Sequence, residues 1–395
     1  MTTGPLIFLI AGEPSGDALG ARLMAALSTA SNGTVRFAGI GGDRMAAAGL
    51  ESLFPMSDLT LFGALEVIPK APHIFRRVKQ TVAAIKAERP AAVVSIDVPG
   101  FAFPVHKRVG ANGIHRIHFV APTVWAYRAG RAKKVARILD HLLALLPFEP
   151  PYFEKEGLAC TYVGHPVVEC AAGQGDGPGF RRRHDIAEDT PLLCVLPGSR
   201  SSEIKTLLPI FRETVARLAA TVPGLTVVVP TVPALADKVE DAVATWPVRT
   251  IATRGESEKF DAFAAANAAL GASGTIALEL AMANVPAVLT YRVHPLSAVW
   301  VRLLAAGKFG TLVNLVVDRR VVPELWQEEC RPDRLADETL RVLTDRTVRA
   351  QQCSAYREAL EILGGEGPTP SERAAETILR TIGLPVPDVG VEKAS

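Results

Sequence analysis

Short apolar runs alternate with amphipathic stretches from one end of the chain to the other, and this order constrains the fold more than any other feature. Most of the runs lack a strict polar alternation, which is typical of parallel strands buried on both faces. Such a βαβα order predicts an α/β protein with doubly wound sheets. The predicted strands cover residues 6–11, 35–40, 92–97, 114–120, 141–146, 192–196, 226–229, 248–251, 268–271 and 287–290, with helices at 17–29, 74–88 and 206–220.

The length of 395 residues favours two domains over one. A segment with four glycines in ten residues, 171–180, predicts a linker between them. We therefore expect an N-terminal domain over 1–170 and a C-terminal domain over 171–354, two Rossmann-like halves that face one another across a cleft. The last helices, at about 355–385, are expected to pack back on the first domain.

Composition excludes several classes of protein. The net charge of +2 is too small for a dedicated nucleic-acid binder. Five scattered cysteines without CxxC spacing predict neither a disulfide framework nor a zinc site, and they fit reduced thiols in the cytosol. The first apolar run is too short for a signal peptide, and no run of 18 apolar residues predicts a membrane-spanning helix.

Two glycine-containing turns in the second half, 197–200 and 271–279, each join a predicted strand to a helix. In the first, Ser199 and Arg200 stand where backbone N–H groups and a guanidinium suit phosphate oxygens. An ordinary strand-to-helix turn with an exposed arginine is the alternative for that segment. A diphosphate needs several donors, so two such turns in one domain support each other.

The second turn holds Ser273, Gly274 and Thr275, which would present further donors to a phosphate. Glu279 lies four residues after Thr275 and therefore on the same helix face. A carboxylate there can accept hydrogen bonds from both ribose hydroxyls, as acidic residues do in dinucleotide sites. The alternative is a solvated helix residue. Since no Asp-x-Asp occurs in the chain, we expect no metal in this site.

Two carboxylates follow predicted strands of the first half. Glu13 ends the first strand and Asp97 ends the third, where ligands bind in open α/β sheets. A partly desolvated Asp97 could act as general base toward an acceptor hydroxyl. Plain capping of a turn is the alternative for both residues. The first turn lacks GxGxxG, which argues against a dinucleotide, and we expect no cofactor.

A segment that mixes aromatic and basic residues, 118–128, follows the fourth predicted strand. Trp125 and Arg128, together with Ser15 at the predicted start of the first helix, are candidates for a pocket that takes a phosphorylated acceptor. A surface helix with a half-buried Trp125 is the alternative.

A further stretch, 59–78, combines apolar residues with a basic rim. Pro69 and Pro72 are expected to interrupt the helix and leave the apolar side chains in an exposed loop, which fits an element that docks on anionic lipid. A core-facing helix with one solvated side is the alternative. The apolar candidates are Leu61, Phe62, Leu65, Val67, Ile68, Ile74 and Phe75.

Taken together, these segments resemble the lipid-A-disaccharide synthase family, over roughly residues 8–330 and in family order. Ala121, Tyr127 and Pro14 depart from the pattern, which puts fine contacts in the acceptor pocket in doubt but not the reaction. The matching pieces are 11–17, 39–45, 95–97, 118–128, 146–149, 163–166, 196–200, 272–275 with Glu279, 291–292, 314–315 and 324–330.

The resemblance implies a GT-B fold and an inverting, metal-free transfer of 2,3-diacylglucosamine from UDP to the 6-hydroxyl of 2,3-diacylglucosamine 1-phosphate (lipid X). It implies peripheral binding to the cytoplasmic leaflet of the inner membrane, and it is compatible with a homodimer. It makes Asp97 the base or its close support, Glu13 an acceptor-side residue, and it adds Asn314 to the UDP site. The rivals are another UDP-N-acetylglucosamine enzyme of GT-B type, either the peptidoglycan transferase or a 2-epimerase, and a non-catalytic nucleotide-sugar binder.

Overall fold

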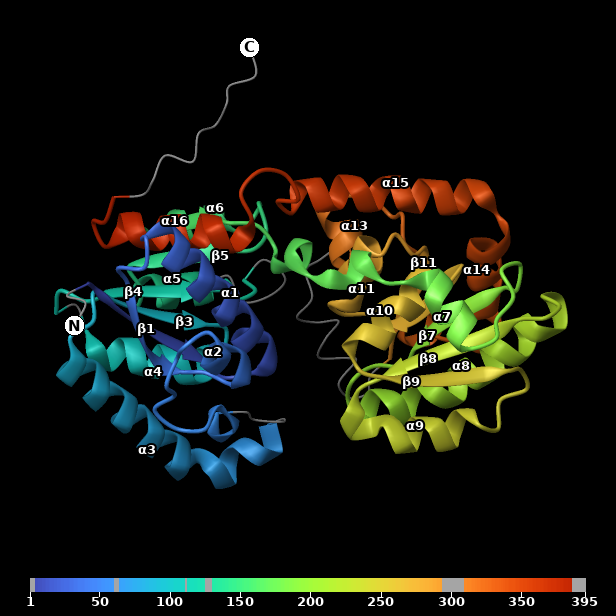
Figure 1. Cartoon of the computed structure of the whole chain (residues 1–395), viewed down its shortest axis with the longest axis horizontal. Helices are drawn as coiled ribbons and strands as arrows, with labels where there is room; N and C mark the ends of the chain where they lie inside the picture. The colour runs from blue at the N-terminus through green and yellow to red at the C-terminus, as the bar shows by residue number, and fades with distance from the viewer. Residues whose placement is uncertain (1–3, 60–63, 111, 125–129, 293–308, 386–395) are drawn as a thin grey trace, which may run out of the picture. The chain divides into compact units, whose positions relative to one another are not determined.

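A computed structural model describes residues 4–59, 64–110, 112–124, 130–292 and 309–385 (Figure 1). The chain folds into two compact units. The first holds Met1–Pro166 and Leu363–Ser395, and the second holds Val167–Ile362. Each unit contains a six-stranded sheet, and every pair of neighbouring strands is parallel. The predicted pair of doubly wound α/β sheets is therefore confirmed.

The sheet of the first unit has the order β2-β1-β3-β4-β5-β6. Its strands are β1 (Leu6–Ala11), β2 (Arg36–Ile40), β3 (Ala92–Ile96), β4 (His115–Phe119), β5 (His141–Ala144) and β6 (Ala159–Tyr162). The helices of this unit are α1 (Pro14–Ala30), α2 (Asp43–Ala47), α3 (Ala64–Glu88), α4 (Pro99–Val109), α5 (Gly130–Ala136), α6 (Pro150–Glu154) and α16 (Pro370–Thr381), with a 3-10 turn η1 (Met56–Asp58).

Strand β1 is buried along its whole length, and its side chains alternate between two cores. Ile7 and Leu9 pack in a cluster with residues of α1 and α16, whereas Phe8 and Ile10 pack in a cluster with residues of α3 and α4. Helices thus cover both faces of the sheet, which is why its central strands read as uninterrupted apolar runs (Figure 1).

The sheet of the second unit has the order β12-β11-β10-β7-β8-β9. Its strands are β7 (Leu192–Leu196), β8 (Thr226–Thr231), β9 (Thr250–Arg254), β10 (Ala268–Ala272), β11 (Ala287–Tyr291) and β12 (Glu324–Trp326). Around it lie α7 (Gly177–Arg183), α8 (Ser201–Thr221), α9 (Ala236–Val243), α10 (Glu256–Ala265), α11 (Ile276–Met282), α13 (Leu312–Val316), α14 (Pro332–Thr344) and α15 (Arg346–Ile362), with 3-10 turns η2 (Pro166–Glu169), η3 (Ala171–Gln174), η4 (Pro233–Leu235) and η5 (Gln327–Glu329).

Two predictions about irregular segments are wrong. Residues 171–180 form η3 and the start of α7 within the second unit, rather than a linker. A Cβ on Gly175 or Gly177 would stand only 2.1 and 2.4 Å from the carbonyl oxygens of Phe260 and Ala264, so these glycines allow close backbone packing on α10. The prolines at 69 and 72 do not interrupt α3, because its later turns are anchored in the core by Val78, Val82 and Ile85.

Candidate functional site

A cavity of about 590 Å³ opens in the second unit at the carboxyl ends of its strands. This edge is where ligands bind in open parallel sheets. The cavity brings together six predicted residues that lie far apart in the sequence, and Glu203 and Lys259 also line it. The six are Ser199, Arg200, Ser273, Gly274, Thr275 and Glu279.

The first turn of this cavity depends on Gly198, whose φ of +108° lies in the region that favours glycine. The backbone N–H groups of Ser199 and Arg200 do not stand open, because both donate to Oε2 of Glu203, over 3.0 and 3.2 Å. The Arg200 guanidinium also donates to this carboxylate over 2.9 Å, yet its side chain is 75% exposed. The turn therefore already holds an anion, and the arginine remains accessible.

The second turn leaves more donors available. The N–H of Ser273 donates to the Thr290 carbonyl over 2.7 Å. By contrast, the N–H groups of Gly274 and Thr275 have no partner in the part of the chain that the structure describes. A Cβ built on Gly274 would meet nothing within 4 Å, so there is open space in front of this backbone. These groups can hydrogen-bond a phosphate without first losing another partner.

Glu279 is held by a neighbour that the sequence analysis missed. Its Oε2 accepts from the Nζ of Lys259 over 2.7 Å, and the two side chains are 24% and 23% exposed. Lys259 lies on α10, directly after the turn that follows β9. The sequence does indicate a third strand-to-helix turn at the same sheet edge, just before Lys259. It gives no indication that Lys259 pairs with Glu279.

Asn314 lies outside this cavity. Its side chain is fully buried, its Oδ1 accepts from the N–H groups of Val321 and Val322, and its Nδ2 donates to Val322 and Glu324. The amide thus braces the segment before β12. Contact between Asn314 and a nucleotide stays a prediction, and in this conformation the amide has no free polar atom to offer.

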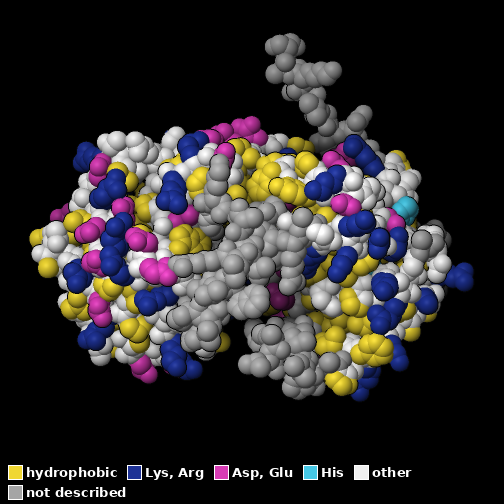
Figure 2. Space-filling view, turned by 180° about the vertical axis from the view of Figure 1, so that it is seen from behind, with side chains coloured by type: hydrophobic (Ala, Val, Ile, Leu, Met, Phe, Trp, Pro, Cys, Tyr) yellow, Lys and Arg dark blue, Asp and Glu magenta, His cyan; other side chains and the backbone are white. Residues whose placement is uncertain are grey.

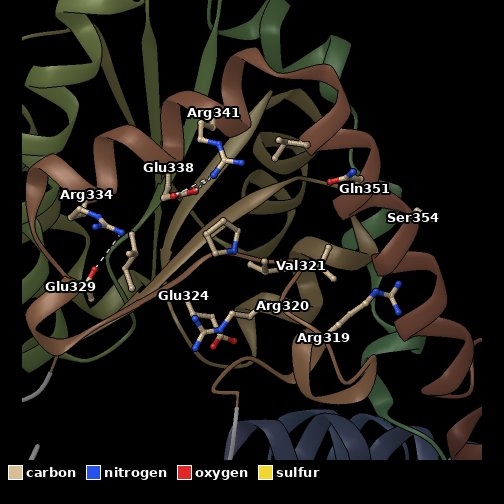
Figure 3. Close-up of a pocket in the computed structure, with 14 residues that line it drawn as sticks. Arg319, Arg320, Val321, Glu324, Glu329, Arg334, Glu338, Arg341, Gln351 and Ser354 are labelled. Carbon is tan, nitrogen blue, oxygen red and sulfur yellow. Dashed lines mark hydrogen bonds and ion pairs between the residues drawn. The ribbon is translucent and has the colours of Figure 1, made fainter.

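A larger cavity of about 760 Å³ lies beside the edge strand β12 (Figure 3). Its charged side chains largely neutralise one another: Arg334 pairs with Glu329, and Arg341 pairs with Glu338. None of the predicted residues lines it. The smaller cavity, where convergent donors and a carboxylate meet, is therefore the candidate functional site.

In the first unit, Asp97 and Val98 form a strained turn between β3 and α4. Both have positive φ, +53° and +50°, which is unfavourable for an aspartate and more so for a β-branched valine. Such strain persists only where the contacts of the surrounding structure hold the backbone in the unfavourable conformation, and it is found most often at active sites. Val98 packs so close to Gly12 that a Cβ there would stand 2.8 Å from its Cγ2. Glu13, exposed at the start of α1, follows this glycine.

Strands β1 and β3 are neighbours, with Ala11 opposite Ile96, so the segments that carry Glu13 and Asp97 leave the sheet at one edge. Ser15 is exposed in the first turn of α1. Trp125 and Arg128 lie outside the described residues. The acceptor candidates that can be placed therefore share one end of the sheet.

A buried polar network braces the strained turn. The Ser95 hydroxyl lies 2.7 Å from both His106 Nε2 and His118 Nδ1, and all three residues are fully buried. Burial lowers the pKa of each histidine to about 3, so both are neutral at ordinary pH. Ser95 precedes the turn on β3, while His106 follows it on α4 and His118 lies on β4. The network thus ties the three elements around Asp97.

The predicted lipid-facing stretch forms much of α3. Leu61 and Phe62 lie outside the described residues, the side chains of Leu65, Val67 and Ile68 are not described, and Ile74 packs against the core. Phe75 is 47% exposed, one of two exposed large hydrophobics in the described part of the chain. Lys79 and Arg108 flank its ring at 4.9 and 5.2 Å. Figure 2 shows hydrophobic and basic side chains intermixed at the lower edge of this unit, on the right.

No helix within the described ranges combines the length and the hydropathy that crossing a bilayer requires. Among the same residues, no three His, Cys, Asp or Glu side chains gather as metal ligands would.

Comparison with known proteins decides the family. The family described as lipid-A-disaccharide synthetase matches residues 7–377. The chain belongs to this family. The lipid-A-disaccharide synthase of Rhodospirillum centenum is 56% identical over 95% of this chain and 94% of its own, and that of Paramagnetospirillum magneticum is 55% identical over 95% and 97%. The chain is thus a glycosyltransferase of lipid A biosynthesis.

Solved structures of low sequence identity share the fold. The "S. aureus MnaA-UDP co-structure" matches 96% of this chain and 98% of its own, with a TM-score of 0.66 at 14% identity. The Acinetobacter baumannii MurG structure matches 95% and 99%, with a TM-score of 0.57 at 13% identity. These likenesses agree with the GT-B architecture expected of lipid-A-disaccharide synthases.

Proposed function

We propose that this lipid-A-disaccharide synthase transfers 2,3-diacylglucosamine from UDP to the 6-hydroxyl of lipid X, with inversion and without a metal. The cavity of the second unit binds the UDP part of the donor, and Asp97 of the first unit receives the acceptor proton. The observation that carries the proposal is the cavity itself, in which a guanidinium, free backbone donors and a carboxylate converge.

The donor site matches the parts of UDP. Free N–H groups at Gly274 and Thr275 and the accessible Arg200 guanidinium supply hydrogen bonds and positive charge for the diphosphate. Charge that develops on the leaving group is stabilised by such fixed donors, so no metal is needed for this step. Glu279 faces the same cavity and supplies an acceptor for ribose hydroxyls.

The acceptor site uses the strained turn. A single displacement with inversion needs a base that removes the proton from the acceptor hydroxyl. Asp97 is half-buried at the end of β3, and its carboxylate forms no hydrogen bond or ion pair within the described part of the chain. It is therefore available to an acceptor hydroxyl. Glu13, at the same edge of the sheet, orients the acceptor together with Ser15.

The acyl chains of both substrates place them in a bilayer, so the enzyme has to reach a membrane surface. Phe75 with its basic neighbours Lys79 and Arg108 is suited to this, because an apolar side chain enters the headgroup region while cations bind anionic lipid. We place the enzyme peripherally on the cytoplasmic leaflet of the inner membrane.

The test is an assay for the disaccharide 1-phosphate from UDP-diacylglucosamine and lipid X in mixed micelles. Wild-type enzyme should form it, Asp97→Ala should lose at least about a hundredfold in turnover but bind UDP as before, and Arg200→Ala should bind UDP more weakly. No product from the wild type would refute the assigned substrates. Full activity of Asp97→Ala would remove this residue from the chemistry, and unchanged UDP affinity of Arg200→Ala by calorimetry would remove the arginine from the donor site.

A further inference from the structure

We propose that Lys259 is a positioning residue that orients the Glu279 carboxylate toward the ribose, and that it thereby sets the preference of the site for ribonucleotides over 2′-deoxyribonucleotides. This inference rests on the proposed UDP site and deepens it.

The geometry of the ion pair supports this role. Lys259 Nζ binds one carboxylate oxygen of Glu279, Oε2, at 2.7 Å. The other oxygen, Oε1, has no partner among the described residues, and both side chains line the nucleotide cavity. One oxygen is thus fixed by the protein and the other is left for a ligand. A carboxylate held in this way presents a defined acceptor, whereas a free glutamate samples several rotamers.

Lys259 is itself held in place. Its ammonium lies 4.6 Å from the ring centre of Phe260 and 6.0 Å from that of Phe263, distances at which cation–π attraction acts. The side chain is only 23% exposed, so solvent screens the ion pair less than it would at an open surface. The two partners come from different helices, α10 and α11, and the pair therefore links these helices.

Ribose is the part of the ligand that such a carboxylate distinguishes. A 2′-hydroxyl donates a hydrogen bond to a charged acceptor, and a deoxynucleotide leaves that acceptor partly desolvated and unpaired. A hydrogen bond to a charged group corresponds to about tenfold or more in affinity. A different role for Lys259 is direct contact with the diphosphate, and the two roles predict different outcomes for the two nucleotides.

The experiment measures dissociation constants of UDP and 2′-deoxy-UDP by calorimetry, first for the wild type, Lys259→Met, Glu279→Gln and the double variant. Lys205→Met is the matched control, since Lys205 is exposed on α8, outside the cavity. We expect the wild type to prefer UDP by about tenfold or more. Lys259→Met should reduce this preference at least threefold, and it should add no further loss in the Glu279→Gln background. Lys259→Arg, which keeps the charge, should retain most of the preference.

An unchanged preference in Lys259→Met, with both nucleotides weakened equally, would overturn the inference and assign Lys259 to the diphosphate. Equal losses from Lys259→Met in the wild-type and Glu279→Gln backgrounds would also overturn it. If the wild type binds no UDP, the proposed donor site itself fails. If it binds UDP and only the Lys259 results disagree, the donor site stands and the positioning role alone is lost.

Discussion

Replacing Ser95 with alanine should destabilise the first unit by about 2–6 kcal/mol. The Ser95 hydroxyl is the partner, at 2.7 Å, of one nitrogen of His106 and one nitrogen of His118. Alanine removes both hydrogen bonds and leaves two fully buried imidazole nitrogens unpaired. Each buried polar group left without a partner costs about 1–3 kcal/mol, which gives the range. The loss is large against a typical stability of about 5–15 kcal/mol.

Equilibrium unfolding in urea at pH 7, followed by circular dichroism on the full chain, measures this difference. Ser57→Ala is the matched control, because Ser57 is exposed and its hydroxyl forms no hydrogen bond within the described residues. Its unfolding free energy should stay within about 0.5 kcal/mol of the wild-type value. If Ser95→Ala loses no more than this control, the buried network does not brace the turn at Asp97.

Two further predictions concern the same unit. Phe75→Ser should lower co-sedimentation with anionic vesicles, and so should the double variant Val67→Ser with Ile68→Ser. The control is Ile362→Ser, which changes the other exposed large hydrophobic in the described part of the chain and should not lower it. Equal vesicle binding of Phe75→Ser and wild type would contradict membrane docking through this residue. The stability of the unit should fall as the pH drops below about 6.5, because His106 and His118 are fully buried with pKa values lowered to about 3 and take up protons only on unfolding. Between pH 6.5 and 5 each should cost about 1.5 kcal/mol, so a flat profile in urea titrations over this window would contradict their burial as neutral groups.

The central strands were predictable because a strand that is buried on both faces is apolar at successive positions of the sequence. The run 192–196 is apolar throughout, and β7 covers the same residues. By contrast, β6 and β12 were missed. Both lie at sheet edges and are short and partly exposed, so neither forms an apolar run. The helix α3 was predicted ten residues too short, because the rule that proline ends a helix ignores the support that tertiary packing gives to the flanking turns.

The site was predictable to the level of its strand-to-helix turns, because the carboxyl ends of parallel strands converge whatever the sequence between them. What remained hidden was the pairing of charges across elements. Glu203 reaches back to the backbone of its own turn, and Lys259 reaches Glu279 from another helix. The sequence also gives no sign that the Asn314 amide, predicted to contact the ligand, is engaged in the fold. Each of these depends on side-chain directions that only the packed structure provides.

In the proposed donor site, the Glu203 carboxylate on the first turn bears on how readily a nucleotide leaves. If a phosphate is to take the N–H groups of Ser199 and Arg200, it has to replace an anion that is tethered four and three residues away and so is always present at high local concentration. The affinity of this turn for a phosphate is then the difference between two similar interactions, that of the N–H groups with the phosphate and that with the Glu203 carboxylate. Glu203 returns to the vacated donors as the phosphate withdraws. Such an exchange favours rapid release of UDP, which an enzyme needs once in every turnover.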